Sequence, residues 1–220
     1  MRFSCIHYEK QFCIQLNKRI MDQDTFLTIQ SETQGIYKDR GSKFLSFAYP
    51  VANEEEIKRN LNHLKKKYHD AKHHCFAFRI GTKKEYYRAN DDGEPSGTAG
   101  KPIFGQIVSK GLTNILVVVV RYFGGTLLGT SGLINAYRAA TIDCLTKATM
   151  VELQIEKTFE VYFPYEQMNS IMRIVKDESL TIGQQQFEKD CRLLLHVRER
   201  EYKRIVQRLA NIKSIRIIDL

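Results

Sequence analysis

A glycine-rich segment that follows an apolar run is the first place where this sequence could do chemistry. Residues 115–120 are all apolar and mostly β-branched, which predicts a buried strand, and glycines follow at positions 124, 125, 129 and 132. Residues 133–145 then have the pattern of a helix. A glycine-rich turn before a helix exposes backbone N–H groups at the positive end of the helix dipole, where anions bind. The segment is therefore a candidate phosphate site; alternatively, its glycines only turn the chain and let the helix pack closely.

The segment does not fit a nucleotide-binding P-loop. Gly124, Gly129 and Ser131 match the glycine and hydroxyl positions of GxxxxGK(S/T), but Thr130 stands at the lysine position. Without that cation the β- and γ-phosphates lose their main counter-charge. We therefore do not expect the segment to bind nucleotides in the manner of a P-loop.

A second cluster of polar residues lies upstream. Asp91, Asp92 and Glu94 place three carboxylates close together, and His73 and Cys75 precede them on one face of an expected strand. Carboxylates and imidazoles together are candidates for general acid and base groups or for metal ligands. No Ser-His-Asp or HExxH arrangement supports either role, and Asp and Gly beside Pro are typical of turns. His73, Asp91, Asp92 and Glu94 are therefore only secondary catalytic candidates, and neither a metal nor a cofactor is expected.

The composition is that of a globular protein with excess positive charge. Of the 220 residues, 43% are hydrophobic and 27% are charged, and the net charge is +9. Residues 21–150 carry +5 of this charge and residues 151–220 only +1, which favours an acidic partner such as RNA for the first part. The five cysteines are scattered without a CxxC pair, so we expect reduced thiols. No apolar run approaches the ~20 residues that span a bilayer, so we expect a cytoplasmic protein with no membrane partner.

The chain is expected to contain a leader and two domains. Residues 1–20 show neither periodicity nor a helix cap, and we interpret them as a leader that is not native or is disordered, with Met21 as the expected start. Residues 21–150 form the expected first domain, with strands at 43–51, 74–80 and 84–89 and a short helix at 102–110. Asn53 and Glu56 predict a capping box for a helix that follows residue 53.

Residues 151–220 form the expected second domain. The pattern predicts strands at 159–163, 180–187, 192–197 and 214–218 and helices at 165–176 and 198–210. This βαββαβ order is typical of a ferredoxin-like sheet with two helices on one face. Arg200, Arg204 and Arg208 recur along one side of the last helix, and neighbouring Glu199 and Glu201 favour an ordinary solvated surface there.

Two segments together resemble the signature segments of the Impact/YigZ family. One is Arg121–Gly125 with Leu128 and Gly129, and the other is Asp91–Pro95 with 97–103. The resemblance covers residues 24–220. It implies an α+β protein with a ribosomal protein S5 domain 2-like N-terminal domain, followed by a ferredoxin-like domain of the kind found at the end of elongation factor EF-G. Eukaryotic Impact proteins share only the first domain and regulate translation through protein partners.

The resemblance supplies no catalytic residues, so we expect a non-enzymatic, translation-associated protein that binds RNA or the ribosome. The expected phosphate- or RNA-binding residues are Lys101, Arg121, Gly124, Gly125, Thr126, Gly129 and Ser131. One alternative is a small-molecule enzyme that acts on a phosphorylated or nucleotide ligand. Another is a protein-interaction module with Tyr122 and Phe123 as an exposed aromatic anchor.

Overall fold

The computed structural model describes residues 24–82, 86–188 and 190–220. The expected leader, residues 1–20, lies outside the described residues. The described chain forms a mixed α and β fold that divides into two compact units. The first contains Phe26–Leu153, and the second contains Gln154–Leu220 with Asp24 and Thr25.

The first unit is built on an antiparallel sheet in the order β2-β3-β6-β4-β5. Its central strand is β6 (Ile115–Tyr122), the apolar run of the sequence. The other strands are β2 (Thr33–Asp39), β3 (Ser42–Pro50), β4 (His73–Ile80) and β5 (Tyr86–Asn90). Strand β6 pairs with β3 on one side and β4 on the other, so the glycine-rich segment leaves the sheet from its centre.

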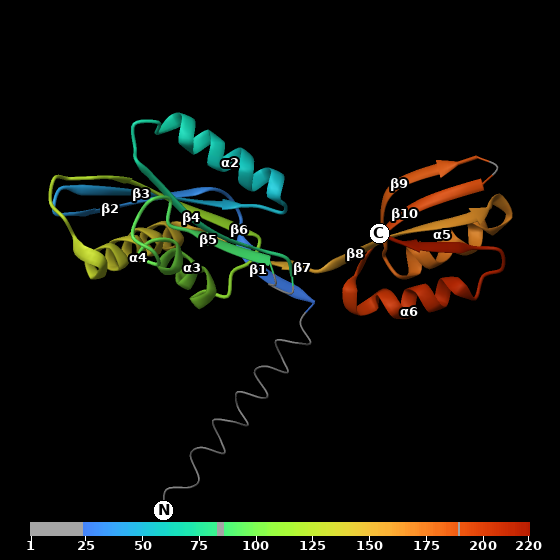
Figure 1. Cartoon of the computed structure of the whole chain (residues 1–220). Helices are drawn as coiled ribbons and strands as arrows, with labels where there is room; N and C mark the ends of the chain where they lie inside the picture. Colours follow the sequence, from blue (N-terminus) through green and yellow to red (C-terminus); the bar gives the residue numbers. More distant parts are fainter. Residues whose placement is uncertain (1–23, 83–85, 189) are drawn as a thin grey trace, which may run out of the picture. The chain divides into compact units, whose positions relative to one another are not determined.

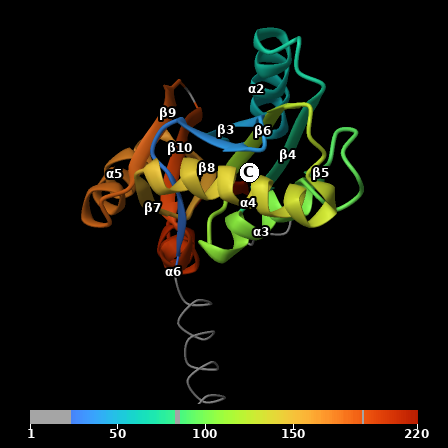
Figure 2. The same cartoon turned by 90° about the vertical axis from the view of Figure 1, so that its left-hand side faces the viewer.

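Helices cover both faces of this sheet. Figures 1 and 2 show α2 (Glu54–Lys67) on one side and α3 (Gly100–Ser109) and α4 (Gly129–Lys147) on the other. Because strand side chains alternate, Val118 and Val120 pack toward α2, whereas Val117 and Val119 pack toward α3 and α4. The prediction of a strand buried on both faces is confirmed, since residues 115–120 are all fully buried.

The predicted start of α2 is confirmed in its main feature. Asn53 Oδ1 accepts a hydrogen bond from the Glu56 backbone N–H at 3.0 Å, as in a capping box. The Glu56 carboxylate, however, accepts from the backbone N–H of Ala52 at 2.8 Å and not from that of Asn53. The cap therefore includes one more residue before the helix than the standard pattern.

A two-stranded ribbon sets the boundary between the units. It joins β1 (Thr25–Ile29) and β7 (Met150–Gln154), and the Gln30 N–H donates to the Thr149 carbonyl at 2.9 Å. This pairing keeps residues 150–153 with the first unit, which ends at Leu153.

The second unit has the element order β8-α5-β9-β10-α6-β11 and one antiparallel sheet in the order β11-β8-β10-β9. Its core lies between one face of the sheet and both helices. The elements are β8 (Glu156–Pro164), a 3-10 turn (Tyr165–Gln167), α5 (Met168–Asp177), β9 (Thr181–Phe187), β10 (Asp190–Arg198), α6 (Glu199–Ala210) and β11 (Arg216–Asp219). The predicted βαββαβ order of elements is confirmed.

Among the residues that the structure describes, no helix is both long enough and apolar enough to cross a membrane.

Candidate functional site

The loop between β5 and α3 is organised around the carboxylate of Asp91. This carboxylate accepts hydrogen bonds from the backbone N–H groups of Gly97, Ala99 and Gly100 at 2.8, 3.0 and 2.8 Å. It therefore occupies the N-terminus of α3, where an anion is favoured by the helix dipole. Burial alone would raise the pKa of Asp91, but these three N–H groups and nearby Lys101 hold that pKa below its usual range. Asp91 thus acts as an internal cap, and the acid–base role considered for it is not supported.

The neighbouring Asp92 ties the loop to β4. Its carboxylate accepts from the His74 backbone N–H at 2.7 Å, and its carbonyl oxygen lies 2.9 Å from His73 Nδ1. Because a carbonyl oxygen can only accept, Nδ1 of His73 carries a proton, and Nε2 of a neutral ring is the acceptor. Burial lowers the pKa of His74 although Asp92 opposes this shift. Asp92 therefore positions the histidine segment, and His73 is the candidate whose second ring nitrogen stays available.

Glu94 and Arg121 form a buried ion pair beneath the glycine-rich loop. Arg121 Nη1 donates to Glu94 Oε1 at 2.7 Å, and the exposed fractions of the two side chains are 7% and 3%. The Tyr137 hydroxyl donates to the same oxygen at 2.8 Å. The guanidinium also lies 5.5 and 5.6 Å from the ring centroids of Phe44 and Phe123. The charge of Arg121, which was expected to contact phosphate, is therefore paired with Glu94 in this structure.

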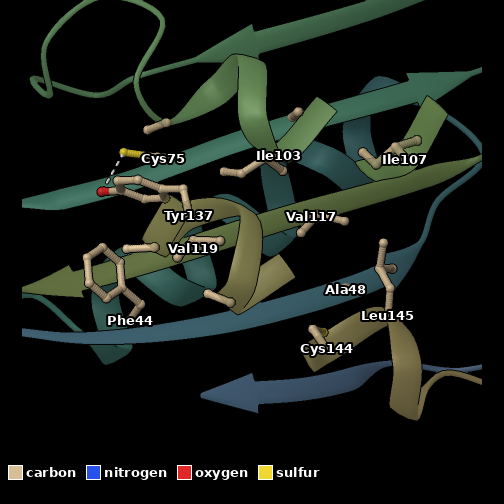
Figure 3. Close-up of a cluster of buried hydrophobic side chains, with 14 of the residues drawn as sticks. Phe44, Ala48, Cys75, Ile103, Ile107, Val117, Val119, Tyr137, Cys144 and Leu145 are labelled. Atoms are coloured by element: carbon tan, nitrogen blue, oxygen red, sulfur yellow. Dashed lines mark hydrogen bonds between the residues drawn. The ribbon is translucent and has the colours of Figure 1, made fainter. Parts of the chain in front are cut away.

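Cys75 extends this network toward the acidic loop. Its thiol lies 2.9 Å from the Asp91 carbonyl oxygen and 3.3 Å from the Tyr137 hydroxyl (Figure 3). Burial raises the pKa of the Cys75 thiol, and burial, together with the neighbouring Cys75 and Glu94 side chains, raises the pKa of Tyr137. Both groups stay protonated at neutral pH, so Cys75 is a core residue and not an activated nucleophile.

The glycine-rich segment itself is an exposed loop that runs directly into α4. The helix begins at Gly129, four residues before its expected start at Leu133, so Thr130 and Ser131 lie in its first turn. Residue Leu128 at the N-cap has no side chain that can accept a hydrogen bond, and residues 129–131 are exposed. The first N–H groups of α4 therefore meet solvent without a side-chain cap, which is the arrangement that binds anions.

The glycines of the loop have different roles. A Cβ on Gly124 would lie 1.8 Å from the backbone carbon of Gly41, and the Gly124 N–H donates to Ser42 Oγ at 3.2 Å. Gly124 is thus required for close approach of two backbones. Gly125 and Gly129 have φ values of +87° and +73° with no atom within 4 Å of a built Cβ, so they serve the turn itself.

A cavity of about 500 Å³ opens beside this loop. The register of β4 and β6 places His73 directly opposite Arg121, and both residues line the cavity. Tyr122 and Phe123 continue the wall from the end of β6. The lining residues are Asp70, Ala71, Lys72, His73, Arg121, Tyr122, Phe123 and Leu127.

The structure brings some of the expected site residues together and separates others. Arg121, Gly124, Gly125 and Thr126 belong to one continuous segment, and His73 joins them across the sheet. Lys101 instead packs against Gly97 and lowers the pKa of Asp91, so it belongs to the acidic loop.

Lys72, Leu127 and the cavity that they share with Phe123 were not predicted from the sequence. The expected aromatic anchor is also only partly exposed. Phe123 is 55% exposed, whereas Tyr122 is half-buried and donates to Asp70 at 2.7 Å. The one available signal was that two large apolar residues, Phe123 and Leu127, stand in a loop that is otherwise rich in glycine.

Arginines of α6, in the second unit, form ion pairs with acidic residues near the end of α5. Arg204 and Arg208 both bind the carboxylate of Glu178, and Arg208 also binds Asp177. The two arginines lower the pKa of Glu178 to about 2. These contacts support the interpretation of the arginine stripe as a solvated surface.

The described residues contain no group of three or more His, Cys, Asp or Glu side chains placed to hold a metal ion. Fold and site together define a two-unit α+β protein with an exposed glycine-rich loop above a buried ion pair. The sequence profile of the Impact N-terminal domain matches residues 40–145. This range contains the glycine-rich loop, the acidic loop between β5 and α3, and the histidine segment of β4.

Several known proteins are similar to this chain over part or most of its length. The IMPACT family member YvyE of Bacillus subtilis is 31% identical over 160 residues, which are 73% of this chain and 74% of YvyE. The IMPACT homolog of Saccharomyces cerevisiae is 38% identical over 96 residues, 41% of this chain and 36% of the yeast protein. A crystal structure described only as that of a hypothetical protein has a TM-score of 0.70 and 26% identity, and the match covers 89% of this chain and 97% of that one. The chain therefore belongs to the IMPACT family, and the resemblance inferred from its two loops is confirmed.

Proposed function

We propose that this protein is a cytoplasmic, non-enzymatic factor that regulates translation by binding RNA or the ribosome through the glycine-rich loop. Within the proposal, the first unit has the ribosomal protein S5 domain 2-like fold and the second the ferredoxin-like fold found at the end of EF-G. The sheet order β11-β8-β10-β9 with both helices on one face supports the second assignment.

One observation carries the proposal: the exposed glycine-rich loop delivers the uncapped N-terminus of α4 to the surface. The helix has nineteen residues, so its dipole is fully developed, and its first turn contains Thr130 and Ser131. Backbone N–H groups and the Ser131 hydroxyl would hold a phosphate there. The positive charge of residues 21–150 would attract the nucleic acid.

Two of the residues expected to bind phosphate already have partners within the protein. The Gly124 N–H already donates to Ser42, and Arg121 is paired with Glu94. The backbone from Gly125 to Ser131 therefore carries the phosphate contacts, with Arg121 as a cation beneath the loop and Lys101 as a contributor to the wider positive field.

The enzyme alternative has less support. Asp91 caps a helix, Asp92 holds the histidine segment and Glu94 is bound by Arg121 and Tyr137, so each carboxylate has a structural task. Among the described residues that line the cavity, His73 alone supplies an imidazole, and its Nε2 is the ring nitrogen left to accept a proton. A single imidazole without a second positioned group is a poor basis for acid–base catalysis.

The test is co-sedimentation of the full chain with ribosomal particles from lysate at low and at high salt. Ser131→Glu places a negative charge at the proposed phosphate position, while Ser131→Gln has the same size without the charge. Glutamate in the first turn of a helix favours folding, so lost binding would not reflect lost structure. We expect salt-sensitive co-sedimentation of the wild type and of Ser131→Gln, with about tenfold weaker binding of Ser131→Glu, the equivalent of ~1.4 kcal/mol.

Two results would count against the proposal. Wild-type protein that stays at the top of the gradient at both salt concentrations would exclude binding to ribosomal particles. Equal binding of Ser131→Glu and Ser131→Gln would move the contact away from the N-terminus of α4.

A further inference from the structure

We propose that the cavity beside the glycine-rich loop takes one nucleotide with an unpaired base, so that this protein binds RNA as a single strand and not as a duplex. The inference rests on the proposed function and specifies which part of an RNA the site would hold.

The cavity has the size and lining of a ligand site. Its volume of about 500 Å³ lies in the range of ~300–1,000 Å³ that is usual for small-molecule pockets. Cationic, aromatic and aliphatic side chains line it together: Lys72 and Arg121, Tyr122 and Phe123, and Leu127. A nucleotide has the complementary chemistry, because it joins an anionic phosphate to a flat apolar ring system.

The cationic side of the cavity contains an incompletely satisfied guanidinium. Arg121 is more than nine-tenths buried and lines the cavity, and its Nε has no hydrogen-bond partner among the described residues. A buried N–H without a partner is costly, so the guanidinium of Arg121 is left incompletely paired at the wall of the cavity. Lys72 is exposed at the same cavity and adds a second positive charge. The lining also contains an acidic residue, Asp70, whose carboxylate accepts a hydrogen bond from the Tyr122 hydroxyl.

The aromatic and aliphatic side is exposed to an unusual degree. Phe123 is 55% and Leu127 81% exposed, although both are large apolar residues that water disfavours. Both line the cavity, so a flat ring that enters it would cover them. Stacking of a base on an aromatic side chain is the usual way in which proteins hold unpaired RNA.

A duplex cannot use this arrangement. A base within a duplex is stacked on its neighbours and paired, so it would have to be unpaired and turned out before it could enter. The loop backbone above the cavity could contact phosphates of either form, but only an unpaired base reaches Phe123. The structure thus separates a phosphate contact that both forms share from a base contact that only the single strand makes.

The experiment measures fluorescence anisotropy of the full chain with a labelled single-stranded RNA of about twelve nucleotides and with its blunt duplex. We expect the single strand to bind about tenfold more tightly than the duplex. Phe123→Ala should weaken single-strand binding about tenfold, the equivalent of one lost stacking contact, and leave duplex binding unchanged. The matched control is Phe187→Ala, because Phe187 is 47% exposed and lies in the second unit.

The possible results separate this inference from the proposed function. Equal affinity for both RNA forms, with Phe123→Ala like the wild type, would overturn the nucleotide cavity and leave RNA binding intact. Absence of binding to either form would overturn both proposals. Displacement of the single strand by adenosine monophosphate at the same nucleotide concentration would overturn the assignment to RNA and identify a free nucleotide as the occupant.

Discussion

The buried pair of Glu94 and Arg121 gives the sharpest prediction about stability. Glu94→Gln keeps a side-chain oxygen for the Tyr137 hydroxyl but leaves the charge of Arg121 unpaired in a site where only 7% of its side chain is exposed. Arg121→Met leaves the opposite charge unpaired. Removal of one partner of a buried pair costs about 3–5 kcal/mol, so each single variant should lose roughly this much free energy of unfolding.

The double variant should be less destabilised than either single variant. With Glu94→Gln and Arg121→Met together, neither position of the pair carries a charge, and the new amide oxygen still accepts from Tyr137. Replacement of both members of a buried ion pair is often close to neutral, so we expect a coupling energy of at least ~2 kcal/mol. Lys147→Met is the control, because the Lys147–Asp143 pair is 52% and 37% exposed and should cost less than ~0.5 kcal/mol.

Urea denaturation followed by circular dichroism measures the loss for the whole chain. Since the chain has two units, hydrogen exchange of peptides from β6 and α4 should be measured in parallel to assign the loss to the first unit. Strictly additive losses, with the double variant as unstable as the sum of the singles, would refute the reasoning. They would show that the two charges do not compensate one another.

Three further predictions concern single residues. Gly124→Ala should lower the free energy of unfolding by more than ~3 kcal/mol, because its Cβ would lie 1.8 Å from the backbone of Gly41. Gly105→Ala in α3 is the control: no atom lies within 4 Å of its Cβ, so the higher helix propensity of alanine should raise the melting temperature. Equal melting temperatures of the two variants would contradict this prediction. Asp91 has a lowered pKa in the folded state, so its contribution to stability is present above the ordinary aspartate pKa and disappears as the pH falls through the folded pKa. The free energy of unfolding, measured at a series of acidic pH values, should show this loss in the wild type and a smaller loss in Asp91→Asn. Burial raises the pKa of Cys75, so iodoacetamide at pH 8 should label this thiol only after unfolding, and rapid labelling of the folded protein, read by mass spectrometry, would argue against a core position.

Local patterns predicted most of the elements because their causes are local. Residues 115–120 are apolar at every position, and such a run is satisfied only by burial on both faces. Asn53 and Glu56 mark the start of α2 because a side-chain oxygen there accepts an N–H from the first turn. The start of α4 was predicted four residues late because Gly129 and Gly132 lie in its first turn, and glycines in a sequence are typical of loops.

The candidate site was only partly predictable, because its partners are distant in sequence. The glycine-rich loop and the acidic loop were both recognised from their composition. The sequence alone could not show that Glu94 would neutralise Arg121, since that contact joins residues 27 positions apart. Asp91 was considered for catalysis although its carboxylate fills the N-terminus of α3, because the conformation of the loop, and not its composition, brings the N–H groups of Gly97, Ala99 and Gly100 to that carboxylate.

The sequence by itself determined the α+β class, the order of most elements and the family, because periodicity, capping residues and two loop signatures are encoded in short stretches of chain. Only the tertiary structure decided which charges remain exposed and where a ligand can enter. The antiparallel register of β4 and β6 places His73 opposite Arg121, so both side chains line the cavity that Phe123 and Leu127 border. Strand register depends on the packing of the whole sheet, so no short segment could reveal it.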